Sequence, residues 1–262
     1  MSTDENSLQK YANELFKAWE RAEQIEPITD ALQSLSIEEA YKIQLKTINK
    51  RIANGETHVG KKIGITAKAV QTMLGVDQPD FGHLMSGMRY NEGDLIPFDQ
   101  FCQPKGEGEI AFLLNKDLNG PGVTATQVIA ATEYVTPSFE IVDSRIDNWK
   151  IKIQDTVADN ASAGAFVLGT SKTSLRGLDL ATCGLVLKKN GRIIGTGAGA
   201  ATLNHPLNAV AWLANTLGQL GISLRAGEVI LSGSLSIMFP IESGDKLEMD
   251  IGGLGKTVCQ FN

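Results

Sequence analysis

The hydrophobic pattern of the chain changes its period near Gly82, and this change limits the folds that are possible. Before it, apolar residues such as Leu8, Leu15 and Trp19 recur at helical spacing, which predicts an amphipathic helix over about residues 8–24. After it, short alternating or continuous apolar runs are separated by turn residues, as in β-strands. A helical first part followed by a strand-rich second part predicts an α+β fold.

Two further helices are predicted in the first part. Ser36 and Glu39 have the spacing of a capping box, in which each side chain binds the other residue's backbone N–H, so a helix begins there. A third, short helix is predicted over 66–74, before Gly75. We therefore predict a mainly helical region over residues 1–85 and a β-roll region over 86–262, which together form one compact unit.

The second part contains a strong hairpin signal, Asn190-Gly191 between two apolar runs. Two helices interrupt the strands. One begins at Thr124, where Gln127 completes another capping box, and one follows Pro206. The remaining runs predict a rolled, largely antiparallel sheet, with strands at 107–114, 136–144, 184–197, 228–233, 245–251 and 257–261.

Charge and composition exclude several functions. The net charge of −6 argues against binding to nucleic acid or to an anionic membrane surface. No apolar run approaches the roughly 18 residues of a spanning helix, and no signal peptide is recognisable. The three cysteines lie far apart, which suggests a reducing, cytoplasmic location.

The glycine-rich run 195–200 follows a hairpin strand rather than a parallel βαβ unit, so no dinucleotide or other organic cofactor is expected.

Three acidic residues, Glu107, Glu109 and Glu140, carry the clearest chemical signal. Glu107 and Glu109 are two apart in a predicted strand and so share a face, which the small Gly106 and Gly108 are expected to leave open. Neighbouring carboxylates repel, and a divalent cation relieves that repulsion. Glu140 lies in a second apolar strand, where an unpaired acid is costly. Such a set suits Mg²⁺ or Mn²⁺ rather than Zn²⁺. The alternative is two solvent-facing glutamates and an ion-paired third.

Six segments carry a resemblance to a known family. In chain order they are GKKIG (60–64), QPDFGHL (78–84), GEGEIAF (106–112), FEIVDSRIDNWKIKIQDTVADNAS (139–162), GAGAA (197–201) and AGEVILSGSL (226–235). Together they resemble the 2-hydroxypenta-2,4-dienoate hydratases, in the hydratase/decarboxylase branch of the fumarylacetoacetate hydrolase-like superfamily. The resemblance runs from about residue 8 to the C-terminus. The sister enzyme 4-oxalocrotonate decarboxylase shares the VDSR and VADNAS segments but is less similar over 60–84.

The resemblance implies a fold, an activity and partners. The fold is a mixed β-roll of the fumarylacetoacetate hydrolase C-terminal-domain type with a helical N-terminal extension. The activity is that of a hydro-lyase in the meta-cleavage pathway for aromatic compounds, which hydrates a small anionic 2-hydroxydienoate to 4-hydroxy-2-oxopentanoate. The resemblance places Mg²⁺ or Mn²⁺ at Glu107, Glu109 and Glu140. It also implies homo-oligomers and a complex with 4-oxalocrotonate decarboxylase.

The chemistry of that reaction requires a general acid/base as well as a cation. Direct addition of water to the dienol is electronically poor, whereas protonation at C5 gives a 2-oxo-3-enoate whose C4 accepts water. The charge that develops on the 2-oxygen is stabilised by a divalent cation. Lys62, in GKKIG, and Asp80, in QPDFG, are the candidates for the catalytic roles. The alternatives are a surface lysine and a turn-forming aspartate, and Lys61 is expected to face solvent.

Four further residues are candidates for contacts with the substrate. If residues 149–153 are extended, Lys150 and Lys152 share a face and reach the anionic substrate, or else they form ion pairs with Asp143 and Asp155. Ser162 is a candidate hydroxyl contact, with a helix cap as the alternative. Ser234 is a further candidate for the pocket lining.

Other functions remain open at this point. The main alternative is decarboxylation of 2-oxo-3-hexenedioate, that is, 4-oxalocrotonate decarboxylase activity. A structural role within a hydratase–decarboxylase complex is a second. A C–C hydrolase of the acylpyruvate type is a third, and the three scattered histidines indicate no water-activating His–Glu pair for it.

Overall fold

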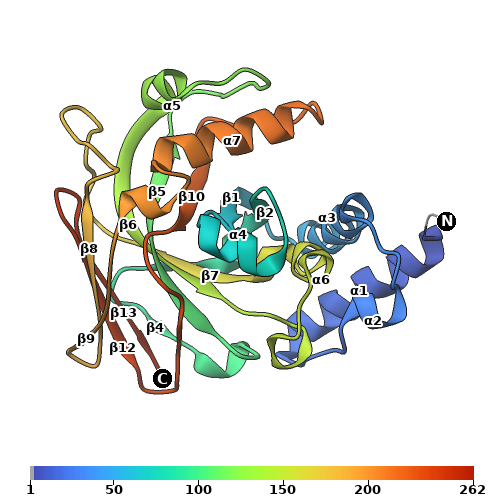
Figure 1. Cartoon of the computed structure of the whole chain (residues 1–262). Helices are drawn as coiled ribbons and strands as arrows, with labels where there is room; N and C mark the ends of the chain where they lie inside the picture. The colour runs from blue at the N-terminus through green and yellow to red at the C-terminus, as the bar shows by residue number, and fades with distance from the viewer. Residues whose placement is uncertain (1–2) are drawn as a thin grey trace.

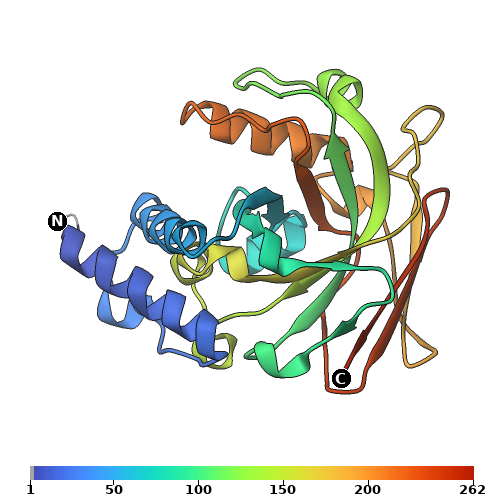
Figure 2. The same ribbon diagram turned by 180° about the vertical axis from the view of Figure 1, so that it is seen from behind.

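The computed structural model describes residues 3–262, which form seven α-helices, five short 3₁₀ turns and thirteen strands (Figures 1 and 2). The α-helices are α1 (Glu5–Arg21), α2 (Ile28–Ala31), α3 (Ile37–Ala53), α4 (Lys68–Leu74), α5 (Ala125–Ala131), α6 (Ile153–Ala158) and α7 (Pro206–Gly218). The 3₁₀ turns are η1 (Ser86–Met88), η2 (Phe98–Gln100), η3 (Asp147–Trp149), η4 (Asn160–Ser162) and η5 (Gly199–Ala201).

Eight strands form a mixed sheet in the order β2-β1-β10-β5-β6-β7-β3, with β11 paired beside β5. The β1–β10 and β3–β7 pairs are parallel and the others are antiparallel. These strands are β1 (His58–Gly64), β2 (Asp80–Met85), β3 (Arg89–Asn91), β5 (Lys105–Leu114), β6 (Thr132–Val142), β7 (Ala163–Leu168), β10 (Val229–Ser234) and β11 (Phe239–Pro240).

The other five strands form a second sheet, in the order β4-β13-β12-β8-β9, which covers one face of β5 and β6. Its strands are β4 (Leu95–Ile96), β8 (Gly184–Lys189), β9 (Arg192–Ala198), β12 (Lys246–Ile251) and β13 (Gly255–Phe261). A side chain at Gly108 would meet Met249 and Leu187, and one at Gly106 would meet Phe239. The expectation that these glycines open the carboxylate face is therefore wrong. They lie on the opposite face, where small size lets the strand pack closely.

Helices α1, α2, α3 and α6 gather at the end of the molecule opposite the five-stranded sheet, whereas α5 and α7 lie along the top in Figure 1 (Figures 1 and 2). An apolar cluster that includes Leu8, Leu15 and Ile43 joins α1 to α3 and extends to Val157 of α6. The larger core lies between the two sheets and under α7. Within residues 3–262, no helix combines the length and the apolar character needed to cross a membrane.

The α+β prediction is confirmed, and so are the predicted capping boxes and the predicted hairpin turn. Both capping boxes form, at Ser36 and at Thr124, and the hairpin joins β8 to β9 through Asn190-Gly191. The condition under which Lys150 and Lys152 would share a strand face is not met, because Trp149 ends the η3 turn and Ile153 begins α6. The division at residue 85 stays a prediction, and β1 and β2 on its N-terminal side belong to the main sheet.

Candidate metal centre and active site

The central feature of the eight-stranded sheet is a group of three glutamates on β5 and β6. Glu107 lies directly opposite Glu140 in the antiparallel register, and Glu109 is two residues further along β5 on the same face. One carboxylate oxygen of each residue lies within 4.8 Å of the others. Glu109 and Glu140 are fully buried and Glu107 is half-buried. The alternative of solvent-facing glutamates is therefore wrong.

Lys62 of β1 and Asp80 of β2 complete this cluster of charges. The Lys62 ammonium lies 3.1 Å from Glu140 Oε1, and both side chains are buried. Asp80 pairs with Gly64 across the β1–β2 ladder, and a side chain at Gly64 would collide with the Asp80 carboxyl and approach Lys62 Nζ. Glycine at this position lets the two charged side chains approach each other. The alternatives of a surface lysine and a purely turn-forming aspartate do not fit this burial.

The electrostatics of the cluster show an excess of buried negative charge. Burial raises the pKa of Glu107 to about 7, with repulsion from Glu140 adding to it and Lys62 opposing it. Burial and the neighbouring carboxylates raise the pKa of Glu109 well above its usual range. Burial alone would lower the pKa of Lys62, but Glu140 and Asp80 outweigh it, so the pKa is raised. Lys62 therefore stays charged at neutral pH.

The three glutamates fit a divalent cation. Glu109 Oε1 and Glu140 Oε2 are buried and accept no hydrogen bond from the residues that the structure describes, and Glu140 Oε1 has the Lys62 ammonium 3.1 Å away. Buried carboxylate oxygens without donors are costly. An oxygen-only ligand set is what Mg²⁺ and Mn²⁺ prefer. These residues would hold such an ion, and its charge would offset the repulsion among them.

The backbone of β10 orients one of these ligands. Gly233 N–H donates to Glu109 Oε2 at 2.8 Å. Gly233 has a φ of +106°, and a side chain on it would collide with Thr66. The buried Thr202 hydroxyl lies 3.2 Å from the carbonyl oxygens of both Gly233 and Ser234 and holds this segment in place. Nothing local in the sequence indicated the roles of Gly233 and Thr202, because both depend on contacts with distant strands.

A strained turn, η4, lies beside β2. Its three residues, Asn160, Ala161 and Ser162, have φ values of 56°, 50° and 53°, in the left-handed region that non-glycine residues avoid. The Asn160 side chain fixes the turn to β2, since its Oδ1 accepts from His83 N at 2.7 Å and its Nδ2 donates to His83 O at 2.9 Å. Such strain is often found at functional sites. Ser162 is buried here, with its hydroxyl 3.2 Å from that of Thr156.

The other candidate substrate contacts fall in different surroundings. Ser234 lies across from Glu109 in the sheet, and its hydroxyl donates to Ser236 O at 2.9 Å. Lys150 and Lys152 are exposed, in contrast to the buried glutamates. Lys150 pairs with Asp147 at 3.1 Å rather than with Asp143 or Asp155.

Two buried ion pairs were not anticipated. Arg145 Nε donates to Asp159 Oδ1 at 2.6 Å, and its other nitrogens bind backbone carbonyls, so it ties the end of β6 to the start of η4. Lys61 was expected to face solvent, and this is wrong. It is buried and donates to Glu228 at 2.8 and 3.0 Å. Because side chains alternate along β1, Lys61 lies on the face of the strand opposite to Lys62, but that face is also buried.

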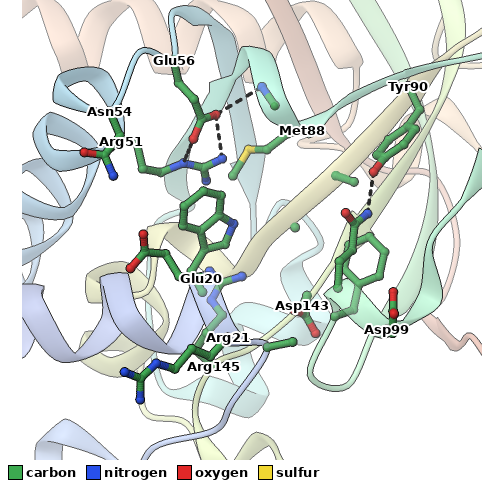
Figure 3. Close-up of a pocket in the computed structure, with 17 residues that line it drawn as sticks. Glu20, Arg21, Arg51, Asn54, Glu56, Met88, Tyr90, Asp99, Asp143 and Arg145 are labelled. Atoms are coloured by element: carbon green, nitrogen blue, oxygen red, sulfur yellow. Dashed lines mark hydrogen bonds and ion pairs between the residues drawn. The ribbon is translucent and has the colours of Figure 1, made fainter.

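A hollow of about 660 Å³ lies away from the glutamates, between α1, α3, β3 and η2 (Figure 3). Its buried charged side chains are Arg51, Asp143 and Arg145, and each is bound to neighbouring groups. Arg51 makes two hydrogen bonds to Glu56, at 2.7 and 2.8 Å, and Arg145 is committed to Asp159. Asp143 accepts from the backbone N–H groups of Cys102 and Gln103. The buried charges of the hollow are therefore already committed to other groups of the protein.

Comparisons with known proteins identify the family to which the chain is similar. Residues 64–262 match the family model described as fumarylacetoacetate (FAA) hydrolase C-terminal. The chain is 51% identical over 261 residues to a 2-hydroxyhexa-2,4-dienoate hydratase of Comamonas testosteroni, covering 99% of each. It is 55% identical over 221 residues to a 2-hydroxypent-2,4-dienoate hydratase of Pseudomonas putida, covering 84% of this chain and 100% of that one.

A solved structure is similar over the whole chain. It is the 4-oxalocrotonate decarboxylase of Pseudomonas putida G7, complexed with magnesium and adipate, with a TM-score of 0.97 and 34% sequence identity. The alignment covers 100% of this chain and 99% of the decarboxylase. The predicted β-roll with a helical N-terminal extension is thereby confirmed. With this fold, and with the family match over residues 64–262, the chain belongs to the fumarylacetoacetate hydrolase family.

Proposed function

We propose that this protein is a hydratase that depends on a divalent metal and adds water to 2-hydroxypenta-2,4-dienoate, or to a homologue with an alkyl group on C5. The product is 4-hydroxy-2-oxopentanoate or its homologue. The observation that carries the proposal is the buried group of Glu107, Glu109 and Glu140 facing Lys62 and Asp80. The proposal is supported by the 51–55% sequence identity of the chain to proteins named as hydratases of these substrates.

The three glutamates are the proposed metal ligands, and Mg²⁺ or Mn²⁺ the proposed ion. The related decarboxylase has been solved with magnesium and with calcium. When bound, the ion would supply Lewis-acid stabilisation of the negative charge that develops on the 2-oxygen of the substrate. No organic cofactor is needed, since the reaction is neither an oxidation nor a group transfer.

Lys62 is proposed to bind and orient the anionic substrate. Because its pKa is raised, it keeps its proton and acts as a fixed positive charge rather than as a general base. It lies between Glu140 and Asp80, so it is placed to attract the substrate carboxylate or the 2-oxygen. Its charge also partly offsets that of the glutamates.

Asp80 is proposed to move the protons. Burial raises its pKa, and its Oδ1 has no hydrogen-bond partner among the described residues. The 2-hydroxyl loses a proton and C5 gains one, which gives the 2-oxo-3-enoate. Water then adds its OH to C4 and its proton to C3. A carboxyl group with a raised pKa suits both proton delivery to carbon and proton removal from water.

The remaining candidate contacts are proposals of unequal support. The burial of Ser162 beside Asn160, and the position of Ser234 next to Gly233, favour these two hydroxyls as neighbours of the substrate. The exposure of Lys150 and Lys152 supports a role in attracting the anion at the surface rather than in binding it beside the glutamates.

We also propose that the chain forms homo-oligomers and a complex with 4-oxalocrotonate decarboxylase, in the cytoplasm. Apolar side chains that are 64–75% exposed, at Met73, Ile193, Leu220 and Ile237, support association. Three free cysteines support a reducing compartment. Light scattering of the purified chain, alone and mixed with the decarboxylase, tests both assemblies. A monomer that does not change on mixing would rule them out.

The experiment that tests the activity identifies the product. Purified protein with Mg²⁺ is given 2-hydroxypenta-2,4-dienoate and, separately, 2-oxo-3-hexenedioate, and both mixtures are followed by NMR and by CO₂ release. The proposal predicts 4-hydroxy-2-oxopentanoate from the first and little CO₂ from the second. Rapid release of CO₂ without hydration of the dienoate would assign the protein as a decarboxylase instead.

A further inference from the structure

A second cavity begins at Asp80 and lies beside β2, the edge strand of the main sheet. Its volume is about 320 Å³, at the lower end of the roughly 300–1,000 Å³ typical of small-molecule sites. We call it the tail cavity. Its walls come from α3, α6, α7 and the segment after α4, and the principal wall residues are Ile37, Tyr41, Val76, Ile153, Val157 and Trp212.

Asp80 joins this cavity to the charged cluster. It lines the tail cavity, and it also lies beside Lys62, whose ammonium contacts Glu140. None of the three glutamates lines the cavity. Asp80 is therefore the residue that the cavity shares with the charged cluster.

The walls of the tail cavity are mainly apolar, with uncharged polar side chains at Gln78, Gln154 and Thr216. Tyr41 stacks on Phe81, with ring centroids 4.5 Å apart and planes inclined by 16°, so its position is fixed. The charged residues that line the cavity are Asp77 and Asp80, and no lysine, arginine or histidine joins them. An uncharged group is therefore accommodated well, whereas a carboxylate would meet two acids and no cation among the described lining residues.

The orientation of the substrate follows from the function proposed above. Its carboxylate and 2-oxygen belong at the metal end and Lys62, and C5, which is protonated, belongs at Asp80. A substituent on C5 therefore starts where the tail cavity starts. We propose that the tail cavity receives the C5 substituent and selects alkyl groups over a carboxylate, which makes it the specificity site of this hydratase.

The proposal is tested by a panel of dienoates that differ only at C5. The substituents are hydrogen, methyl, propyl and carboxylate, and kcat/KM is measured for each with Mg²⁺ present. The wild-type protein should use the methyl and propyl compounds well, and the carboxylate compound about 100-fold less well, because an unpaired carboxylate is strongly disfavoured in such surroundings.

Variants on two opposite walls fill the cavity. Val76→Phe, after α4, and Thr216→Trp, on α7, should each lower kcat/KM for the propyl compound relative to the unsubstituted one by about 10-fold or more. Thr216→Lys supplies the missing cation and should raise relative use of the carboxylate compound by about 10-fold. Val70→Phe is the matched control, because Val70 is exposed on α4 and does not line the cavity.

The outcomes separate this inference from the function on which it rests. If the wild-type protein hydrates none of the four compounds, the proposed function fails and the inference fails with it. If it hydrates the unsubstituted dienoate, but the filling variants slow all four compounds equally, the tail cavity is wrongly assigned. Equal use of the methyl and carboxylate compounds by the wild-type protein would also overturn the assignment.

Discussion

At the scale of single residues, the sequence predicts which face of a strand a side chain lies on, but it does not predict whether that face is buried. Two-residue spacing placed Glu107 and Glu109 on one face, as the structure confirms. The same rule put Lys61 opposite Lys62, but it could not reveal that both faces of β1 are covered. The error at Gly106 and Gly108 has the same origin, since Phe239, which packs on Gly106, and the second sheet, which packs on Gly108, come from distant sequence.

Gly233 offers the sharpest prediction at this scale. Replacing Gly233 with alanine strains a φ of +106°, collides with Thr66 and disturbs the N–H that holds Glu109. Loss of such support around a ligand typically costs about 10- to 100-fold in metal affinity. We therefore expect Gly233→Ala to bind Mg²⁺ that much more weakly in isothermal titration calorimetry.

Gly244→Ala is the matched control for this experiment. Gly244 also has a positive φ, of 84°, but a side chain there would meet open space. The control therefore carries similar backbone strain without touching the site. Equal Mg²⁺ affinity in Gly233→Ala and Gly244→Ala would show that the Gly233 N–H does not position the ligand.

At the scale of elements, the sequence predicted what short-range interactions decide. Helix starts at Ser36 and Thr124 and the Asn190-Gly191 turn were read correctly, because caps and tight turns depend on neighbouring residues. The parallel pairing of β1 with β10, which brings Lys62 to the glutamates, is not local and left no such signal. The Arg145–Asp159 pair that anchors η4 was invisible for the same reason.

That anchor should dominate the stability of the η4 turn. Both side chains of the Arg145–Asp159 pair are buried, so Arg145→Met leaves an unpaired buried carboxylate and should lower the free energy of unfolding by about 3–5 kcal/mol. Urea denaturation measures this. The exposed Arg225–Asp117 pair is the control, and Arg225→Met should cost no more than about 1 kcal/mol. Similar costs for the two variants would refute the anchoring role.

At the scale of the whole molecule, an acidic protein encloses a site for an anionic substrate. The net charge of −6 says nothing of this by itself. The fold gathers Lys62 and the three glutamates from strands β1, β5 and β6, and the proposed cation together with Lys62 would favour an anion there. The resemblance in sequence indicated the ligands, and the sheet order explains how distant segments bring them together.

Global stability should depend on pH through His83. Burial lowers the pKa of His83 to about 3 from 6.5, with His58 and Lys61 adding to the effect. Below pH 6.5 the unfolded chain binds a proton that the folded chain excludes, so stability is lost as pH falls from 6.5 towards 3. The slope from this group reaches at most about 1.4 kcal/mol per pH unit.

Comparison of the wild-type protein with His83→Gln isolates that contribution. The difference between their unfolding free energies, measured in urea at several pH values, should change across this window and stay constant above about pH 7.5. A difference that does not vary between pH 7 and pH 4 would mean that His83 takes up its proton in the folded state.

The central claim is that the buried glutamates hold a divalent cation on which hydration depends. The most direct measurement is the rate of loss of 2-hydroxypenta-2,4-dienoate absorbance, with protein stripped by EDTA, then dialysed and titrated with Mg²⁺ or Mn²⁺. The account predicts almost no turnover in the stripped protein and full recovery on titration, but no recovery in Glu109→Gln. Full turnover by the metal-free protein would contradict it.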